Sequence, residues 1–164
     1  MQVGDAATML RGIPLFSGLD ASKLKLLAFA SDYLTFEPGQ ILFSVGEPAD
    51  CAYVVEQGEV EIWAKTDGHE VKVGTLGRHE LVGEMAIFRN ARRSATIRAV
   101  GRVKVLRIDA HMFLELVTQD AGAATAVMRA LSEKLVRATE QYEQLEERVR
   151  AGGSSSSPNG GAGG

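Results

Sequence analysis

The stretch GEMAIFRNARRSAT, residues 83–96, breaks the pattern of a chain that otherwise alternates short apolar segments with turns. It opens like the start of a helix that carries Glu84, turns at Asn90, and ends with two arginines and a hydroxyl. A β-strand has no structural need for a glycine, a carboxylate, two arginines and a serine in this order. We therefore interpret the stretch as a candidate binding site, held in place by the segments around it.

Short β-rich segments surround this stretch on both sides. Turn signals such as Pro38-Gly39 and Asp67-Gly68 separate them at intervals of roughly ten residues. Many short strands at even spacing are typical of an antiparallel sandwich or roll. The segments are ILFSV (41–45), AYVVEQ (52–57), VEIWA (60–64), EVKVGTL (70–76), ATIRAV (95–100) and VKVLRI (103–108).

Helical patterns replace the strand pattern towards both ends of the chain. Residues 19–30 predict a short helix that Asp20 can cap, and Asp109 can cap a second helix over residues 110–117. A long helix is expected after that, once Gly122 breaks or bends the chain.

The sequence therefore predicts an α+β, mainly β fold. It is an antiparallel, jelly-roll-like β-roll flanked by N-terminal helices and a long C-terminal helix. The last residues are rich in glycine and serine, which favours a flexible tail or linker. We expect one domain over residues 1–150, with the β-roll at about 33–108, C-terminal helices at about 109–150, the long one from about 123, and the tail at 151–164.

The composition argues against several classes of partner. The chain has 164 residues and a formal net charge of −3, so we expect it to bind neither nucleic acid nor an anionic membrane surface. No apolar run approaches the ~18 residues that span a bilayer, and the N-terminus does not resemble a signal peptide. We expect a cytoplasmic protein without membrane insertion. The one cysteine, Cys51, is typical of a small core residue.

The long C-terminal helix carries an apolar seam with alternating spacings of three and four residues. Such a seam pairs helices in a coiled coil, and each exposed leucine or valine forgoes roughly 1.5–3 kcal/mol of burial. A helix packed only on its own β-domain would explain the first half of the seam but not the distal half, so we expect a homodimer. The seam residues are Met128, Leu131, Leu135, Ala138, Tyr142, Leu145 and Val149.

Residues 83–96 supply donors for an anion beside an acceptor for a hydroxyl group. If GEMAIF forms a helical turn, its first N–H groups are unpaired, and Gly83 lets a ligand approach the backbone closely. Arg93 offers a charged fork suited to phosphate, and Ser94 offers a hydroxyl donor. Glu84 would repel a phosphate, so we expect it to accept from a sugar hydroxyl, which describes a ribose-phosphate pocket. The alternative is that Gly83 only forms a turn and that Glu84 and Arg93 form an ion pair.

This stretch resembles the phosphate-binding cassette of the cyclic nucleotide-binding domain family. The family pattern is Gly-Glu, then apolar and small residues, a short loop, and Arg, a small or hydroxyl residue, Ala and Thr. Here it reads GEMAIF (83–88), a loop, and RSAT (93–96). The run FEPGQILFSVGEPADCAYVVEQGEVEIW (36–63) resembles the family's first strands, including the turn at Gly58. The likeness covers about residues 15–145 and implies a β-roll that binds cAMP or cGMP.

The resemblance implies a role for each matching residue. Glu84 would accept from the ribose 2′-hydroxyl, Arg93 would pair with the cyclic phosphate, and Gly83 would lie against the sugar. Two backbone N–H groups and the Ser94 hydroxyl would complete the phosphate cradle. The predicted ligand-binding residues are Gly83, Glu84, Met85, Ala86, Arg93, Ser94 and Ala95, of which Ala86 and Ala95 would contribute the N–H groups.

Arg92 departs from the family, in which proline commonly precedes the arginine. It adds a second charge, which either competes with Arg93 or reinforces it. Ser94 does not decide between cAMP and cGMP, because a hydroxyl there can touch the phosphate or a guanine edge; we expect cAMP. The resemblance also implies that the C-terminal helix supplies a lid over the base, for which the candidates are Arg129, Leu135 and Thr139.

We expect a non-catalytic sensor that changes conformation on binding and signals to an unidentified downstream protein. The alternative is a dimerisation scaffold of the same fold without a ligand, against which the presence of both Glu84 and Arg93 argues. A jelly-roll metalloenzyme would need clustered histidines, and His69, His79 and His111 are scattered. We therefore predict no catalytic residue, no metal and no cofactor besides the nucleotide ligand. Whether the chain stands alone or is the sensor end of a longer protein stays open.

Overall fold

The computed structural model describes residues 2–155, and residues 1 and 156–164 lie outside the described part. The chain divides into two compact units, of which the first ends at Val127 and the second begins at Met128. The described strands and residues 83–96 all belong to the first unit, whereas the second contains the distal part of one helix.

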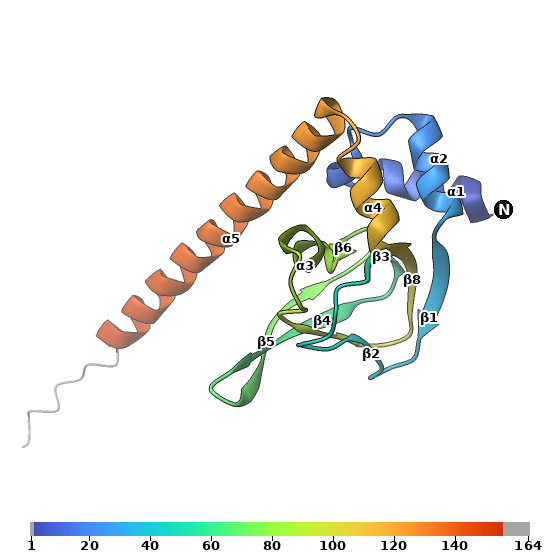
Figure 1. Ribbon diagram of the computed structural model, residues 1–164. Coiled ribbons are helices and arrows are strands. Elements are labelled where there is room, and N and C mark those ends of the chain that lie inside the picture. The colour runs from blue at the N-terminus through green and yellow to red at the C-terminus, as the bar shows by residue number, and fades with distance from the viewer. Residues whose placement is uncertain (1, 156–164) are drawn as a thin grey trace, which may run out of the picture. The chain divides into compact units, whose positions relative to one another are not determined.

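Within the described residues, eight antiparallel strands form two four-stranded sheets (Figure 1). This arrangement confirms the antiparallel β-roll that the spacing of turn signals predicted. The first sheet has the order β1 (Asp32–Phe36), β8 (Val103–Asp109), β3 (Cys51–Gln57) and β6 (Leu81–Val82), and the second has the order β2 (Ile41–Phe43), β7 (Thr96–Ala99), β4 (Val60–Thr66) and β5 (His69–Leu76).

Two of the predicted turns show why the strands end where they do. Gly58 joins β3 to β4 with a φ of 93°, and a Cβ on it would lie 2.6 Å from the Arg102 carbonyl oxygen. Only glycine fits this turn without a shift of the backbone. Asp67 and Gly68 join β4 to β5 with φ values of 51° and 80°. Positive φ at both central residues is the geometry of a type I′ hairpin turn.

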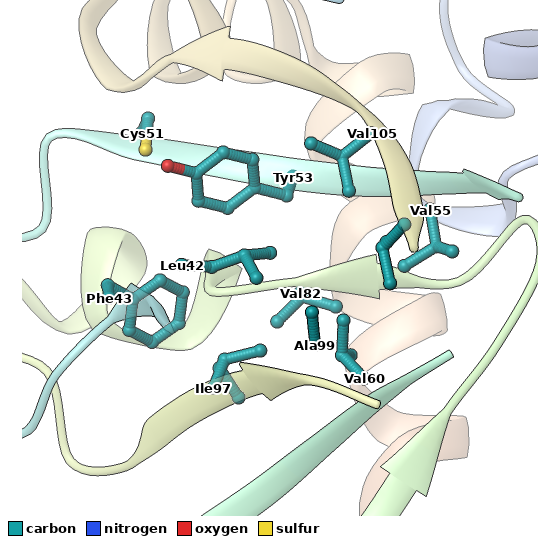
Figure 2. Packing of buried hydrophobic residues seen from close by; sticks show 11 residues of the cluster. Leu42, Phe43, Cys51, Tyr53, Val55, Val60, Val82, Ile97, Ala99 and Val105 are labelled. Atoms are coloured by element: carbon teal, nitrogen blue, oxygen red, sulfur yellow. The ribbon is translucent and has the colours of Figure 1, made fainter. Parts of the chain in front are cut away.

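Side chains from both sheets meet in one hydrophobic core, which Figure 2 shows. The Tyr53 ring meets Phe36 edge-on and stacks on Phe43, with centroid distances of 6.1 Å and 6.2 Å. Residues 51–55 are all buried, because the core covers one face of β3 while α3 (Glu84–Arg89) and α4 (Ala110–Val117) pack against this strand. The buried cluster consists of Leu42, Phe43, Cys51, Tyr53, Val55, Val60, Val82, Ile97, Ala99, Val103 and Val105.

Helices α1 (Gln2–Arg11), α2 (Ala21–Phe29) and α4 gather at one end of the roll (Figure 1). The Asp20 side chain accepts a hydrogen bond from the Lys23 backbone N–H at 2.9 Å. The Asp109 side chain accepts one from the Met112 backbone N–H at 3.2 Å. Both predicted N-caps are therefore confirmed.

An aromatic cluster connects α3 to these helices. Phe113 of α4 is fully buried, and its ring centroid lies 5.7 Å from that of Phe16 in the 3₁₀-helix η1 (Pro14–Phe16). The Phe113 centroid also lies 5.3 Å from that of Phe88 on α3. The short helix of residues 83–96 is thus fixed between β3 and the helical end of the roll.

The last helix, α5 (Ala121–Ser155), begins earlier and ends later than predicted. The Asp120 side chain accepts from the Ala123 backbone N–H at 2.8 Å and so caps the helix. The chain therefore turns before Gly122, which lies in the first turn of α5 and does not break the helix. Of the tail predicted over residues 151–164, the part up to Ser155 is helical and the remainder lies outside the described residues.

The predicted seam on α5 is largely exposed. Five of its side chains in the second unit are between 57% and 68% exposed: Met128, Leu135, Tyr142, Leu145 and Val149. Among the described residues, no helix combines the length and the apolar composition needed to cross a membrane.

Candidate functional site

Gly83 links β6 to α3 and makes room for the side chains around it. Its φ of 90° lies in the left-handed region that favours glycine. A Cβ on Gly83 would lie 2.7 Å from Arg93 Nη1 and 3.0 Å from Phe43 Cε2. Glycine is therefore required here both for the backbone conformation and for the space that Arg93 and Phe43 fill.

The six-residue helix α3 buries its carboxylate. Glu84 is 3% exposed and Ala86 is also buried, whereas the Met85 side chain between them is exposed. Glu84 lies in the first turn of α3, where a negative charge is favoured by the helix dipole. Asn90 ends the helix in the left-handed conformation with a φ of 51°, which confirms the predicted turn.

Arg93 brings a buried cation into contact with Gly83. Its side chain is 3% exposed, Nη1 donates to the Gly83 carbonyl oxygen at 2.8 Å, and Nη2 donates to the Cys51 carbonyl oxygen at 2.5 Å. Its Cζ lies 3.9 Å from the centroid of the Phe43 ring. Within the described part of the chain, the buried Nε has no hydrogen-bond partner. A buried donor in this state costs free energy, so an acceptor that enters the site is stabilised there.

The loop after β2 holds the arginine end of the stretch. The Gly46 N–H donates to the Arg93 carbonyl oxygen at 2.9 Å, and the Arg93 N–H donates to the Glu47 carbonyl oxygen at 2.8 Å. Arg92 is exposed, and its Nη1 donates to the Gly46 carbonyl oxygen at 2.9 Å. Arg92 therefore binds the loop after β2 to residues 83–96, a role that the sequence did not indicate.

The residues after Arg93 divide between the surface and the interior. Ser94 is exposed, Ala95 is half-buried and Thr96 is buried. The Thr96 hydroxyl oxygen accepts from the Val45 N–H at 3.1 Å, which fixes the start of β7 to the loop after β2. Thr96 is therefore structural, while the Ser94 hydroxyl lies on the accessible side.

Cys51, which contacts Arg93, and Tyr53, which is hydrogen-bonded to Cys51, are buried groups. Burial raises the pKa of the Cys51 thiol, whose sulfur lies 3.6 Å from Arg93 Nη2. Burial, together with the hydrogen bond to Cys51, raises the pKa of the Tyr53 phenol well above its ordinary value. The buried position of Cys51 confirms its interpretation as a core residue. In the described residues, no group of three His, Cys, Asp or Glu side chains lies together as a metal site requires.

The predicted lid residues Arg129, Leu135 and Thr139 lie on α5 in the second unit. Leu135 is exposed, and the Thr139 hydroxyl donates to the Leu135 carbonyl oxygen at 2.9 Å. This hydrogen bond does not exclude Thr139 as a lid residue. Its hydroxyl oxygen still has lone pairs that can accept a hydrogen bond from an amino group. Their role as a lid stays a prediction.

The sequence analysis missed Phe43 and the Cys51 carbonyl as parts of this site. The pairing of β2 with β7 shifts register between Ile41 and Phe43, and the consecutive residues Leu42 and Phe43 are both buried. Strand alternation cannot predict two neighbouring inward side chains. A backbone carbonyl has no residue type of its own, so the sequence gives no signal for it.

A β-roll that holds a short helix, a buried glutamate and a buried arginine in one continuous stretch defines a ligand-binding regulatory domain. Residues 33–120, more than half of the chain, match the cyclic nucleotide-binding domain family, and the chain belongs to that family.

Relatives place this domain in larger proteins. The chain is 32% identical over 120 residues to a cAMP-dependent protein kinase regulatory subunit of Emericella nidulans, covering 73% of this chain and 28% of the relative. It is 30% identical over 122 residues to a putative potassium channel protein of Rhodopseudomonas palustris, covering 73% of this chain and 29% of the relative. It thus spans less than a third of either curated relative.

A solved structure supports the same fold. The sensor domain of the transcriptional regulator DNR from Pseudomonas aeruginosa matches with a TM-score of 0.74 at 24% identity, covering 84% of this chain and 93% of that chain.

Proposed function

We propose that this chain is a non-catalytic sensor that binds a cyclic nucleotide, cAMP in preference to cGMP, and passes a conformational change to a partner protein. The observation that carries the proposal is the buried Arg93, whose Nε lacks a hydrogen-bond partner in the described part of the chain. The two carbonyls that Arg93 contacts carry no formal charge, so a cyclic phosphate would add a charge-assisted hydrogen bond that they do not supply. Membership of the family supports this class of ligand.

The other cassette residues have matching roles in the proposal. Glu84 accepts from the ribose 2′-hydroxyl, in a buried position where water does not compete well for it. The Gly83 backbone lies against the sugar, and Met85 flanks the ligand. The Ser94 hydroxyl reaches the phosphate from the accessible side. The backbone N–H groups of Ala86 and Ala95 complete the cradle.

The signal is proposed to pass through α5. Arg129, Leu135 and Thr139 close over the base, and the nucleotide favours the closed state because only that state makes these contacts. A homodimer through the α5 seam would report the change to its partner. The named relatives include a putative potassium channel protein and a kinase regulatory subunit, so the partner is expected to be an effector domain or protein of that kind.

Calorimetric titration of the full chain with cAMP and with cGMP tests the proposal. Arg93→Ala is expected to weaken nucleotide binding by roughly 1.5–3 kcal/mol, the range for a hydrogen bond to a charged group, with the fold intact by circular dichroism. Arg102→Ala is the matched control, because this exposed arginine pairs with Glu37 outside residues 83–96 and is expected to leave affinity nearly unchanged.

Two results would contradict the proposal. If saturating cAMP and cGMP give neither heat nor a thermal shift, the chain is a scaffold, since a ligand at 100 times its Kd stabilises by about 2.7 kcal/mol. If cGMP displaces cAMP at equal concentration, the proposed base preference is wrong and the cassette assignment stands.

A further inference from the structure

Phe43 lies beneath the cassette, although neither the motif nor the proposed ligand contacts include it. Its side chain is buried at the end of β2, and Arg93 Cζ lies 3.9 Å from its ring centroid. Its ring atoms Cε2 and Cζ lie 3.0 Å and 3.3 Å from the position that a Cβ on Gly83 would take. One ring therefore supports both Gly83 and Arg93.

A second ring keeps Phe43 in place. The Tyr53 and Phe43 rings are stacked, with a centroid distance of 6.2 Å and an angle of 15° between their planes. Figure 2 shows both rings in the core between the sheets, with the Tyr53 hydroxyl pointing towards the Cys51 sulfur. Cys51 in turn accepts from Arg93 through its carbonyl oxygen. The ring is thus part of a packed layer and cannot tilt without moving its neighbours.

The backbone fixes the distance between Phe43 and Arg93. Phe43 is paired with Ile97 of β7, the strand that directly follows the cassette. The Gly46 N–H donates to the Arg93 carbonyl oxygen, and the Val45 N–H donates to the Thr96 hydroxyl oxygen. The segment after Phe43 and the segment after Arg93 are therefore held side by side.

An aromatic face is suited to hold an arginine that must still bind an anion. The ring face is the negative side of its quadrupole, so it attracts a cation without placing a full charge near the ligand. All guanidinium N–H groups lie in the plane of the group, so a contact through its face occupies none of them, and within the described residues Nε keeps its donor without a partner. A carboxylate in the place of Phe43 would instead neutralise Arg93 and repel a phosphate.

We infer that Phe43 is a positioning residue for nucleotide binding: its ring holds the Arg93 guanidinium in the orientation that presents Nε to the cyclic phosphate. This inference rests on the proposed function. It assigns the affinity of the site in part to a core side chain that touches no ligand atom.

The first measurement needs no nucleotide. In proton–nitrogen spectra of the ligand-free full chain, the ring current of Phe43 is expected to shift the Arg93 Hε resonance upfield. The resonance is assigned by its loss in Arg93→Lys, and it is expected to lose the upfield shift in Phe43→Leu. A wild-type chain without the shift overturns the inference, because the ring and the guanidinium are then not stacked in solution.

The second measurement is calorimetric titration with cAMP. Phe43→Leu is expected to raise the Kd roughly 5- to 30-fold. Phe36→Leu is the matched control: Phe36 packs edge-on against Tyr53 in the same core, so its loss lowers thermal stability but is expected to leave the Kd within about twofold. A Phe43→Leu variant that keeps wild-type affinity overturns the inference.

Fluorinated phenylalanine at position 43 separates electrostatics from shape. Variants with one, two and three ring fluorines have a progressively weaker negative potential on the ring face but nearly the same ring shape. The Kd for cAMP is therefore expected to rise stepwise, while the melting temperature stays nearly constant. A Kd that does not change across the series overturns the inference. The series also tests the inference if the Phe43→Leu variant fails to fold. A wild-type chain that shows the upfield signal but binds neither cAMP nor cGMP overturns the proposed function, and the inference falls with it.

Discussion

Arg93 is stabilised in the interior by groups that carry no formal charge. A buried charge costs several kcal/mol unless dipoles or a counter-charge stabilise it. The Gly83 and Cys51 carbonyl dipoles and the Phe43 ring provide this stabilisation while the cation keeps its attraction for an anion. If the proposed function holds, we expect these neutral neighbours to influence the affinity of the site together with the arginine itself.

Gly83→Ala tests how closely these neighbours fit. The new Cβ would lie 2.7 Å from Arg93 Nη1, so the guanidinium must move away from the Gly83 carbonyl oxygen. We expect cAMP affinity to fall roughly 10- to 150-fold, the equivalent of one charged hydrogen bond, in calorimetric titration. The strained φ of 90° adds about 1–3 kcal/mol of destabilisation.

Gly39→Ala is the control for this strain. Gly39 has a φ of 84°, but a Cβ there would meet nothing within 4 Å. We expect a similar loss of stability from the backbone alone, about 1–3 kcal/mol, with unchanged cAMP affinity. Equal losses of affinity in the two variants would show that the contact between position 83 and Arg93 is unimportant.

Tyr53 is expected to make the protein sensitive to alkali. Because burial raises the pKa of both the Tyr53 phenol and the Cys51 thiol, the folded state holds their protons more tightly than the unfolded state. Stability is then full below the unfolded pKa values, about 8.5 for cysteine and 10 for tyrosine, and falls as the pH rises beyond them. Urea unfolding should show a smaller loss between about pH 8 and pH 11 for Tyr53→Phe than for the wild type. Tyr142→Phe, at an exposed position, should behave like the wild type.

At the scale of the elements, local signals predicted six of the eight described strands, all except β1 and β6, and they predicted the helix ends less well. The turns at Gly58 and Asp67-Gly68 were predictable because positive φ restricts the residue types allowed. Helix α1 was not predicted as a separate element: it contains Gly4, and its apolar face becomes evident only where it packs against α2. The start of α5 was predicted at about residue 123, whereas the helix begins at Ala121, because the cap at Asp120 determines it.

The candidate site was predictable where residue type carries the chemistry. Arg93 donates to the Gly83 carbonyl oxygen, and Arg93 and Glu84 are both buried, while the roles of these residues in ligand binding stay predictions. Phe43 was not predictable, since its inward direction depends on a register shift between two strands that are far apart in sequence. Contacts made by backbone atoms and by bulged strands therefore form the part of the site that sequence patterns do not encode.

Helix α4 offers a test of the packing behind the cassette. Phe113→Ala removes a fully buried ring that contacts Phe16 and Phe88, so we expect a loss of about 3–5 kcal/mol in the free energy of unfolding. Phe29→Ala on α2 is the control, because its ring is 76% exposed, and it should cost no more than about 0.5 kcal/mol. Comparable losses in chemical denaturation would show that Phe113 does not hold the helices to α3.

At the scale of the whole molecule, the exposed seam on α5 argues for a partner chain. Leu135, Tyr142 and Val149 repeat every seven residues on one helix and are each more than half exposed. Exposed side chains of this kind gain free energy when two such helices pair. In a sensor built this way, a change in α5 would reach both protomers at once, so the oligomeric state bears directly on how the nucleotide signal is passed on.

Leu145→Asp tests the dimer because it places a charge in the middle of the distal seam. The wild-type chain is expected to sediment as a dimer, and Leu145→Asp is expected to shift it towards monomer, since pairing would bury two unpaired carboxylates and forfeit roughly 1.5–3 kcal/mol of burial for each leucine. Gln144→Asp is the matched control, since it introduces the same charge one residue away and off the seam, and it should stay dimeric. A monomeric wild type, or equal dissociation in both variants, would mean that this helix is not a dimer interface and that the nucleotide signal must leave through another surface.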